Sequence, residues 1–161
     1  MLFIYRILIN LIILFSPLII LVRVIKNKED KFRFKEKFCF FSKKRGNGKL
    51  IWFHGSSVGE ILSVIPLIEK LEKKKRINKI LLTSSTLSSS KILSKFKLKK
   101  TIHQFFPIDS DLLTKKFLSY WKPSTAIFIE SEIWPNMLIN VKKKKNTSYT
   151  FKCKDYGKFI Q

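Results

Sequence analysis

The chain has 161 residues, of which 45% are hydrophobic, so it suits one domain and is not an intrinsically disordered protein. Its 33 lysines and arginines against 11 acidic residues give a net charge of +22, which favours an anionic partner such as nucleic acid, an acidic membrane surface or a phosphorylated substrate. Biased codon usage with lysines on solvated faces is the alternative, because the chain holds a single alanine. Its two cysteines exclude a disulfide framework.

The N-terminal segment is predicted to be a membrane-anchor helix covering residues 1–25. Ile7 to Val22 is almost entirely apolar and would span roughly 24 Å as a helix. The flanking residues extend it to the ~30 Å of a bilayer core if Arg6 and Arg23 reach the interfaces. Residues 26–48 form a basic juxtamembrane segment, which the positive-inside rule places in the cytoplasm and close to anionic lipid. A helix that spans the bilayer and one that lies in a single leaflet both remain open.

Strand and helix patterns alternate over residues 49–141. The spacing predicts strands over 50–53, 79–83, 101–106 and 125–130, and helices over 61–71, 88–96, the stretch after Asp109 or Ser110, and the stretch that opens at Trp134. This alternation predicts an α/β domain with a Rossmann-like parallel sheet, whose ligands bind at the carboxyl ends of the strands.

The last segment, residues 142–161, shows no periodicity and no strand that would complete the unit. It begins with four consecutive lysines, whose adenine-rich codons are a natural place for a reading-frame slip. We expect an aberrant or disordered tail outside the ancestral fold, which resequencing of the gene across the lysine run would test.

The turn HGSSVGE, residues 54–60, follows the first predicted strand and has two interpretations. In one, Ser57 is the N-cap of the next helix, Glu60 is its capping-box partner, and Gly59 supplies backbone freedom. In the other, Glu60 lies at the mouth of the sheet as a general base that deprotonates a hydroxyl nucleophile. The two are compatible, because a cap would fix the direction of the carboxylate.

Hydroxyl and histidine side chains follow the next strands. The run TSSTLSSS contains Thr83 and Ser84, which suit either an ordinary loop or the binding of a phosphate or sugar hydroxyls. His54 and His103 are the only histidines and lack metal-ligand spacing, so we predict no metal site.

The stretch ESEIWPN, residues 130–136, places two carboxylates at the end of a buried strand. Glu130 and Glu132 would point to the same side of an extended chain, and buried carboxylates are costly unless they are paired or used. Trp134 adds a stacking surface and Asn136 a bidentate amide.

These stretches, taken in order, resemble the N-terminal half of 3-deoxy-D-manno-octulosonic acid (Kdo) transferases, over about residues 1–140. IWFHGSSVGE and IFIESEIWPNML carry most of the resemblance. It implies a GT-B glycosyltransferase on the cytoplasmic side of the cell inner membrane that transfers Kdo from CMP-Kdo to the lipid A precursor, without a cofactor. A GT-B enzyme has two Rossmann-like domains, so this chain is expected to be truncated and to lack the domain that holds most of the donor.

The resemblance also implies roles for individual residues. Glu60 corresponds to the catalytic base, and Glu130 to a carboxylate that stabilises positive charge developing on the sugar. The expected substrate-binding residues are Ser57, Gly59, Thr83, Ser84, Glu132 and Asn136.

Two other functions follow from different features of the chain. A non-catalytic, membrane-bound remnant that binds acidic lipid would need only the anchor and the basic segment. A nucleic-acid binder would rest on charge alone, and we predict no nucleic-acid partner, because no binding motif is visible and the basic residues cluster near the anchor.

Overall fold

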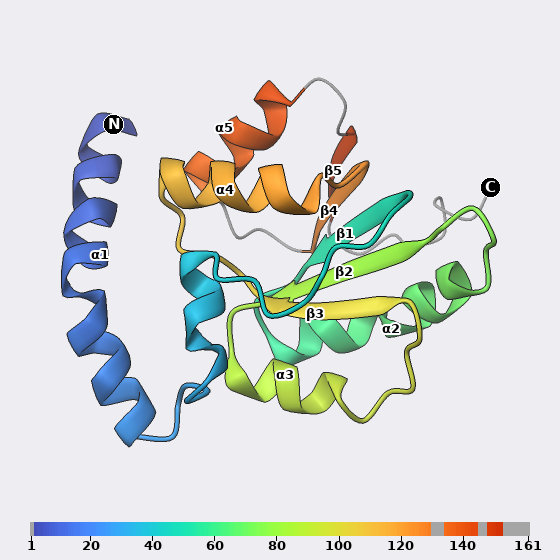
Figure 1. Cartoon of the computed structure of the whole chain (residues 1–161), viewed down its shortest axis with the longest axis horizontal. Helices are drawn as coiled ribbons and strands as arrows, with labels where there is room; N and C mark the ends of the chain where they lie inside the picture. Colours follow the sequence, from blue (N-terminus) through green and yellow to red (C-terminus); the bar gives the residue numbers. More distant parts are fainter. Residues whose placement is uncertain (1, 130–133, 145–147, 153–161) are drawn as a thin grey trace.

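A five-stranded parallel sheet forms the centre of the molecule (Figure 1). The computed structural model describes residues 2–129, 134–144 and 148–152. The strands are β1 (Leu50–His54), β2 (Lys79–Ser84), β3 (Thr101–Phe105), β4 (Thr125–Ile129) and β5 (Ser148–Lys152), in the order β3-β2-β1-β4-β5. The prediction of an α/β fold with a parallel sheet is therefore confirmed.

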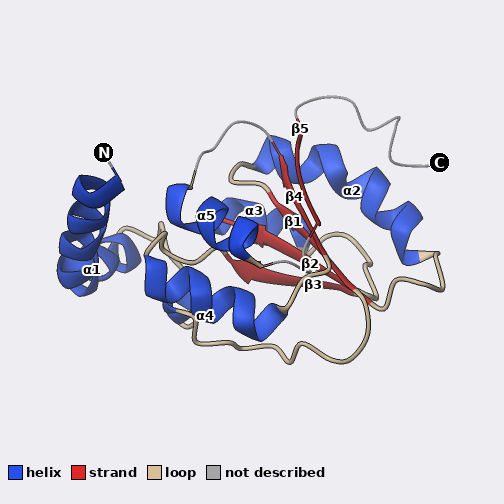
Figure 2. Ribbon diagram, turned by 90° about the horizontal axis from the view of Figure 1, so that it is seen from above, coloured by secondary structure: helices blue, strands red, loops and turns tan. Residues whose placement is uncertain are grey.

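Helices cover both faces of the sheet (Figures 1 and 2). They are α2 (Val58–Glu72), α3 (Leu87–Leu93), α4 (Asp111–Trp121) and α5 (Pro135–Lys143). Trp52 of β1 belongs to the core cluster that contains residues of α4 and α5, whereas its neighbour Phe53 belongs to the cluster of α2 and α3. Successive strand residues thus bury opposite faces, which is why the strands read as nearly continuous apolar runs.

The fifth strand corrects the expectation for the end of the chain. Ser148–Lys152 pairs in parallel with β4, from Thr125 opposite Ser148 to Ile129 opposite Lys152. The prediction that no strand follows residue 141 is therefore wrong for this segment. The sequence SYTFK alternates polar and aromatic residues, a strand pattern that the preceding lysines obscured. Residues 153–161 lie outside the described part of the chain.

The strand order places a topological switch point between β1 and β4. The chain runs outward from β1 to β2 and β3, and then returns to place β4 on the other side of β1. Ligands of open α/β sheets bind outside the carboxyl ends of the strands at such a point. The turn between β1 and α2 begins there, beside the end of β4.

The N-terminal helix α1 (Leu2–Ile25) lies at one end of the molecule, next to α4 and the short 3-10 helix η1 (Arg33–Phe38) (Figure 1). Polar contacts attach it to the domain near its start, where the Tyr5 hydroxyl donates to Asp109 at 2.8 Å and Arg6 pairs with Asp111. In its last turn, Arg23 pairs with the buried Glu29 at 3.1 Å. Helix α1 is long and apolar enough to cross a membrane, by length and composition.

Asp109 organises the junction between α1 and α5. Its buried carboxylate accepts the backbone N–H groups of Asn136 and Met137 at 2.9 and 2.7 Å, and it also accepts the hydroxyl of Tyr5. Trp134, the N-cap of α5, supplies no side-chain cap, so Asp109 caps this helix from another loop. Burial raises the pKa of Asp109, while its three hydrogen bonds act in the opposite direction.

We expect the substitution Asp109→Ala to lower the free energy of unfolding by about 2–5 kcal/mol, because it leaves buried donors without an acceptor. Asp111→Ala is the comparison, since Asp111 makes partly exposed ion pairs, and it should cost about 1 kcal/mol. Urea unfolding of the detergent-solubilised chain, followed by circular dichroism, measures both. Equal effects would contradict the capping role of Asp109.

Candidate active site

The turn between β1 and α2 holds the Glu60 carboxylate at the switch point. Ser57 is the N-cap of α2, and its hydroxyl oxygen accepts the backbone N–H of Glu60 at 3.2 Å. The carboxylate in turn accepts the backbone N–H of Ser56 at 2.8 Å and the Ser57 hydroxyl at 2.7 Å. The N-cap predicted at Ser57 is therefore present, whereas the Glu60 carboxylate reaches back to the backbone N–H of Ser56, the residue before the N-cap; Glu60 stays partly exposed. A carboxylate at a helix N-terminus also interacts favourably with the helix dipole.

The two glycines of this turn differ in their surroundings. A Cβ atom on Gly55 would lie 3.1 Å from Cβ of Glu60 and 3.2 Å from Cδ1 of Ile129, so the start of the turn is packed against the end of β4. Gly59 is exposed within the first turn of α2, and its nearest contact would be the Ser57 hydroxyl at 4.0 Å. A side chain at position 55 would therefore crowd Glu60 and Ile129, whereas Gly59 leaves open space beside Glu60.

We expect Gly55→Ala to lower the free energy of unfolding by about 1–3 kcal/mol, because Ile129 and Glu60 would have to shift. Gly59→Ala adds the same methyl group on an exposed helical position, and it should change stability by less than about 1 kcal/mol. Chemical denaturation of the two variants compares them directly. Equal destabilisation would mean that the packing beside Gly55 does not constrain the turn.

Thr83, a predicted substrate-binding residue, is instead a buried link between β1 and β2. Its hydroxyl donates to the carbonyl oxygen of Phe53 at 3.3 Å and accepts the Trp52 indole N–H at 2.9 Å. Nδ1 of His54 lies 3.0 Å from this hydroxyl and 3.3 Å from the Thr83 carbonyl oxygen. A carbonyl only accepts, so Nδ1 carries the proton and Nε2 the lone pair. Burial lowers the pKa of His54 to about 3, so this imidazole is neutral.

Ser84, the next predicted substrate-binding residue, is also buried, and its hydroxyl is hydrogen-bonded within the protein. Arg33 donates to Nδ1 of His103 at 3.0 Å, so Nε2 of His103 carries the proton and donates to the Ser84 hydroxyl at 2.9 Å. Arg33 also pairs with the buried Glu36, which accepts the backbone N–H of Phe105 at 2.9 Å. Burial, and then the Arg33 charge, lower the pKa of His103 to about 3. Ser84 thus helps to attach η1 to the sheet.

Asn136 is likewise buried, and its side chain is hydrogen-bonded within the protein. Its side-chain N–H donates to the carbonyl oxygen of Asp109 at 2.6 Å, and its amide oxygen accepts from Arg6 at 3.0 Å. Thr83, Ser84 and Asn136 are thus buried and hydrogen-bonded within the protein, and their expected contacts with substrate stay a prediction. Ser57 and Gly59 are exposed beside Glu60, as the expected roles require. Glu130 and Glu132 lie outside the described residues.

Ser85 and Lys37 lie at the same edge of the sheet but do not appear among the predicted residues. The Ser85 hydroxyl is 3.4 Å from that of Ser56, and the ammonium of Lys37 donates to the Ser85 carbonyl oxygen at 3.4 Å. Lys37 also pairs with Glu29 at 2.7 Å. The serine run pointed to Ser85, whereas Lys37 comes from a segment far from the motif. The described residues contain no cluster of three or more side chains suited to a metal ion.

The edge therefore offers a fixed, partly exposed carboxylate with the hydroxyl groups of Ser57, Ser56 and Ser85 nearby, whereas the charge of Lys37 is paired with Glu29. Such a set can accept a proton from a bound hydroxyl group and form hydrogen bonds with a sugar ligand.

Comparison with known proteins identifies the family. The model of the family described as "3-Deoxy-D-manno-octulosonic-acid transferase (kdotransferase)" matches residues 32–152. The "3-deoxy-D-manno-octulosonic acid transferase" of Rickettsia bellii is 40% identical over 128 residues, which cover 80% of this chain. The "Probable 3-deoxy-D-manno-octulosonic acid transferase, mitochondrial" of Arabidopsis thaliana is 36% identical over 140 residues, or 85% of this chain. The matches cover 31% of the length of each relative. The chain belongs to the 3-deoxy-D-manno-octulosonic-acid transferase family.

Proposed function

We propose that this chain forms the acceptor-side half of a glycosyltransferase that transfers Kdo from CMP-Kdo to the lipid A precursor, lipid IVA. The observation that carries this proposal is the Glu60 carboxylate, which two hydrogen bonds hold at the switch point while it remains partly exposed. The donor would be held largely by the part of the relatives that this chain does not span.

In the proposed reaction, Glu60 takes the proton from an acceptor sugar hydroxyl. The oxygen attacks the anomeric carbon of Kdo as the bond to CMP breaks, and CMP leaves with the electron pair of that bond. The open space at Gly59 would let the acceptor approach Glu60, and Ser57 would orient it. Glu130, one residue after β4, would stabilise the positive charge developing on the transferred sugar, and Glu132 would bind substrate.

Helix α1 and the lysines that follow it support a place on the cytoplasmic side of the inner membrane. Much of the helix surface is apolar and exposed, including Leu14, Phe15 and Leu18. Lys26, Lys28 and Lys35 are exposed close to its C-terminal end. Both features suit an anionic lipid surface, which is also where the acceptor lipid would be presented.

A chimaera tests this function, because the match covers 31% of the Rickettsia bellii relative. In it, this chain replaces the matching part of that relative, and the purified protein receives CMP-Kdo and lipid IVA. We expect a product larger by one or more Kdo units, with one CMP released for each. A folded chimaera that transfers nothing, in an assay where the intact relative is active, would favour a non-catalytic domain that binds acidic lipid.

A further inference from the structure

Helix α1 packs against the domain along one stripe. Ile9, Ile13, Ser16 and Ile20 recur at helical spacing and are less exposed than their neighbours; Ser16 and Ile20 are only 4% and 9% exposed. Leu14 and Leu18, off this stripe, are 69% and 63% exposed. One face of the helix therefore meets the domain, and the rest is left for another apolar phase.

A slot of about 480 Å³ opens between this stripe and η1. Apolar side chains of α1 and η1 form most of its wall, namely Ile13, Pro17, Ile20, Val24, Phe34 and Phe38. Ser16 also lines it, but its hydroxyl donates to the Ile13 carbonyl oxygen at 2.6 Å within the helix. The wall thus offers almost nothing to a polar ligand, and an apolar chain would fit it best.

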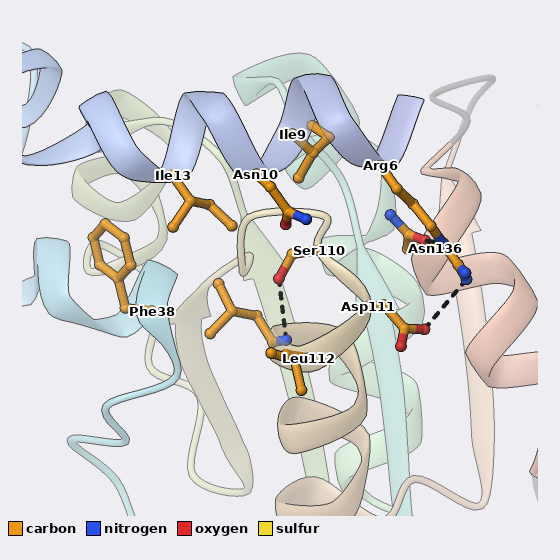
Figure 3. Close-up of a pocket in the computed structure, with 10 residues that line it drawn as sticks. Arg6, Ile9, Asn10, Ile13, Phe38, Ser110, Asp111, Leu112 and Asn136 are labelled. Atoms are coloured by element: carbon orange, nitrogen blue, oxygen red, sulfur yellow. Dashed lines mark hydrogen bonds and ion pairs between the residues drawn. The ribbon is translucent and has the colours of Figure 1, made fainter. Parts of the chain in front are cut away.

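A second cavity of about 470 Å³ continues the slot toward the start of α1, and Ile13 and Phe38 line both (Figure 3). The wall of this second cavity is more polar, with Arg6, Asn10 and Asp111 around it. Arg6 is already paired there with Asp111 and Asn136. An apolar chain in the slot therefore has room to extend, but the neighbouring cavity offers no uncompensated positive charge at Arg6.

Lys31 supplies the positive charge at the slot itself. It is the single charged residue of the lining, it is exposed, and none of the ion pairs among the described residues involves it. Three further exposed lysines, 26, 28 and 35, lie within five residues of Lys31 in the sequence and add to the positive charge of this segment. The slot thus combines an apolar wall with one available cation, and it adjoins the exposed apolar surface of α1.

We propose that the slot binds one acyl chain of an anionic phospholipid from the bilayer, with the lipid phosphate paired to Lys31. The bound acyl chain would fill the space between α1 and η1, so that the apolar surfaces of both elements face the membrane together. A peptide would leave its backbone groups without partners against this wall. None of the proposed catalytic residues lines the slot, so lipid binding there can be tested without sugar transfer.

Native mass spectrometry of the full chain, released from detergent with added phosphatidylglycerol or phosphatidylcholine, tests the site. We expect one phosphatidylglycerol retained per chain, and weaker retention of phosphatidylcholine. Lys31→Glu should weaken phosphatidylglycerol binding by about tenfold or more. Lys26→Glu changes the net charge equally outside the slot and should weaken it by less than about threefold. Equal losses in the two variants would reveal only a diffuse basic surface and overturn the proposal.

Two further variants test the slot itself. Ile20→Trp places a bulky ring in it and should abolish retention, whereas Leu18→Trp adds the same ring on the exposed side of α1 and should leave it unchanged. Circular dichroism at pH 7 checks that each variant keeps the fold. Undiminished retention in a folded Ile20→Trp variant, or a lipid-free dimer of the wild-type chain, would overturn the proposal. A chimaera that fails to transfer Kdo would leave these results unaffected.

Discussion

The substitution Glu60→Gln is expected to reduce Kdo transfer by the chimaera by about 10²–10⁴-fold, because an amide cannot take the proton from the acceptor hydroxyl. The fold should survive, since the amide oxygen can still accept one of the two hydrogen bonds that hold the carboxylate. Loss of the negative charge at the start of α2 should cost about 0.3–1 kcal/mol of stability. Initial rates at saturating CMP-Kdo and lipid IVA, together with urea unfolding, separate the two effects.

Glu69→Gln provides the control, because Glu69 is an exposed glutamate on the same helix and lies about two and a half helical turns after Glu60. Its transfer rate should equal that of the unsubstituted chimaera. A Glu60→Gln variant that keeps more than about a tenth of the wild-type rate would show a loss too small for a missing general base. Another group would then take the proton from the acceptor hydroxyl. Gly59→Ala refines the picture: a folded variant that transfers poorly would indicate that the acceptor passes over this glycine.

The sequence predicts the order of the elements well, because that order depends on local patterns. The apolar runs of β1 and β4 and the N-cap at Ser57 all lie within short windows. β5 was missed because its alternation is only five residues long and its partner strand, Thr125–Ile129, lies some twenty residues earlier. A short edge strand depends on the neighbour with which it pairs, and periodicity alone does not reveal that neighbour.

The site was predictable only in part, for a related reason. Glu60 and its cap are four residues of one turn, so their spacing fixes their geometry. The hydrogen bonds of Ser84 and Asn136 depend instead on His103 and Arg6, which belong to other elements. A hydroxyl or amide residue after a strand gives the same sequence pattern whether its side chain contacts substrate or a buried partner. Tertiary contacts decide between the two, and here both side chains are hydrogen-bonded to residues of other elements.

Acidification is expected to destabilise the domain from about pH 6.5 downward, well above the range in which most carboxylates titrate. The pKa of His54 is lowered to about 3 by burial, and that of His103 to about 3 by burial and by Arg33. Below the ordinary histidine pKa the unfolded chain takes up protons that the native state does not, so stability is present above that value and is lost as the pH falls toward 3. Each fully buried histidine contributes at most about 1.4 kcal/mol per pH unit.

His54 should dominate this loss, because it is 2% exposed whereas His103 is only partly buried. We expect the free energy of unfolding to fall by about 2–4 kcal/mol between pH 7 and pH 5. Asp30, Glu72 and Asp111 have lowered pKa values, so their stabilisation is lost only at lower pH, as their folded-state carboxylates protonate. His54→Phe keeps the ring that stacks on Phe106 at 3.8 Å and removes the titrating group. Its stability should therefore depend less steeply on pH, and an unchanged slope in urea titrations between pH 7 and pH 5 would mean that His54 is not held neutral in the native state.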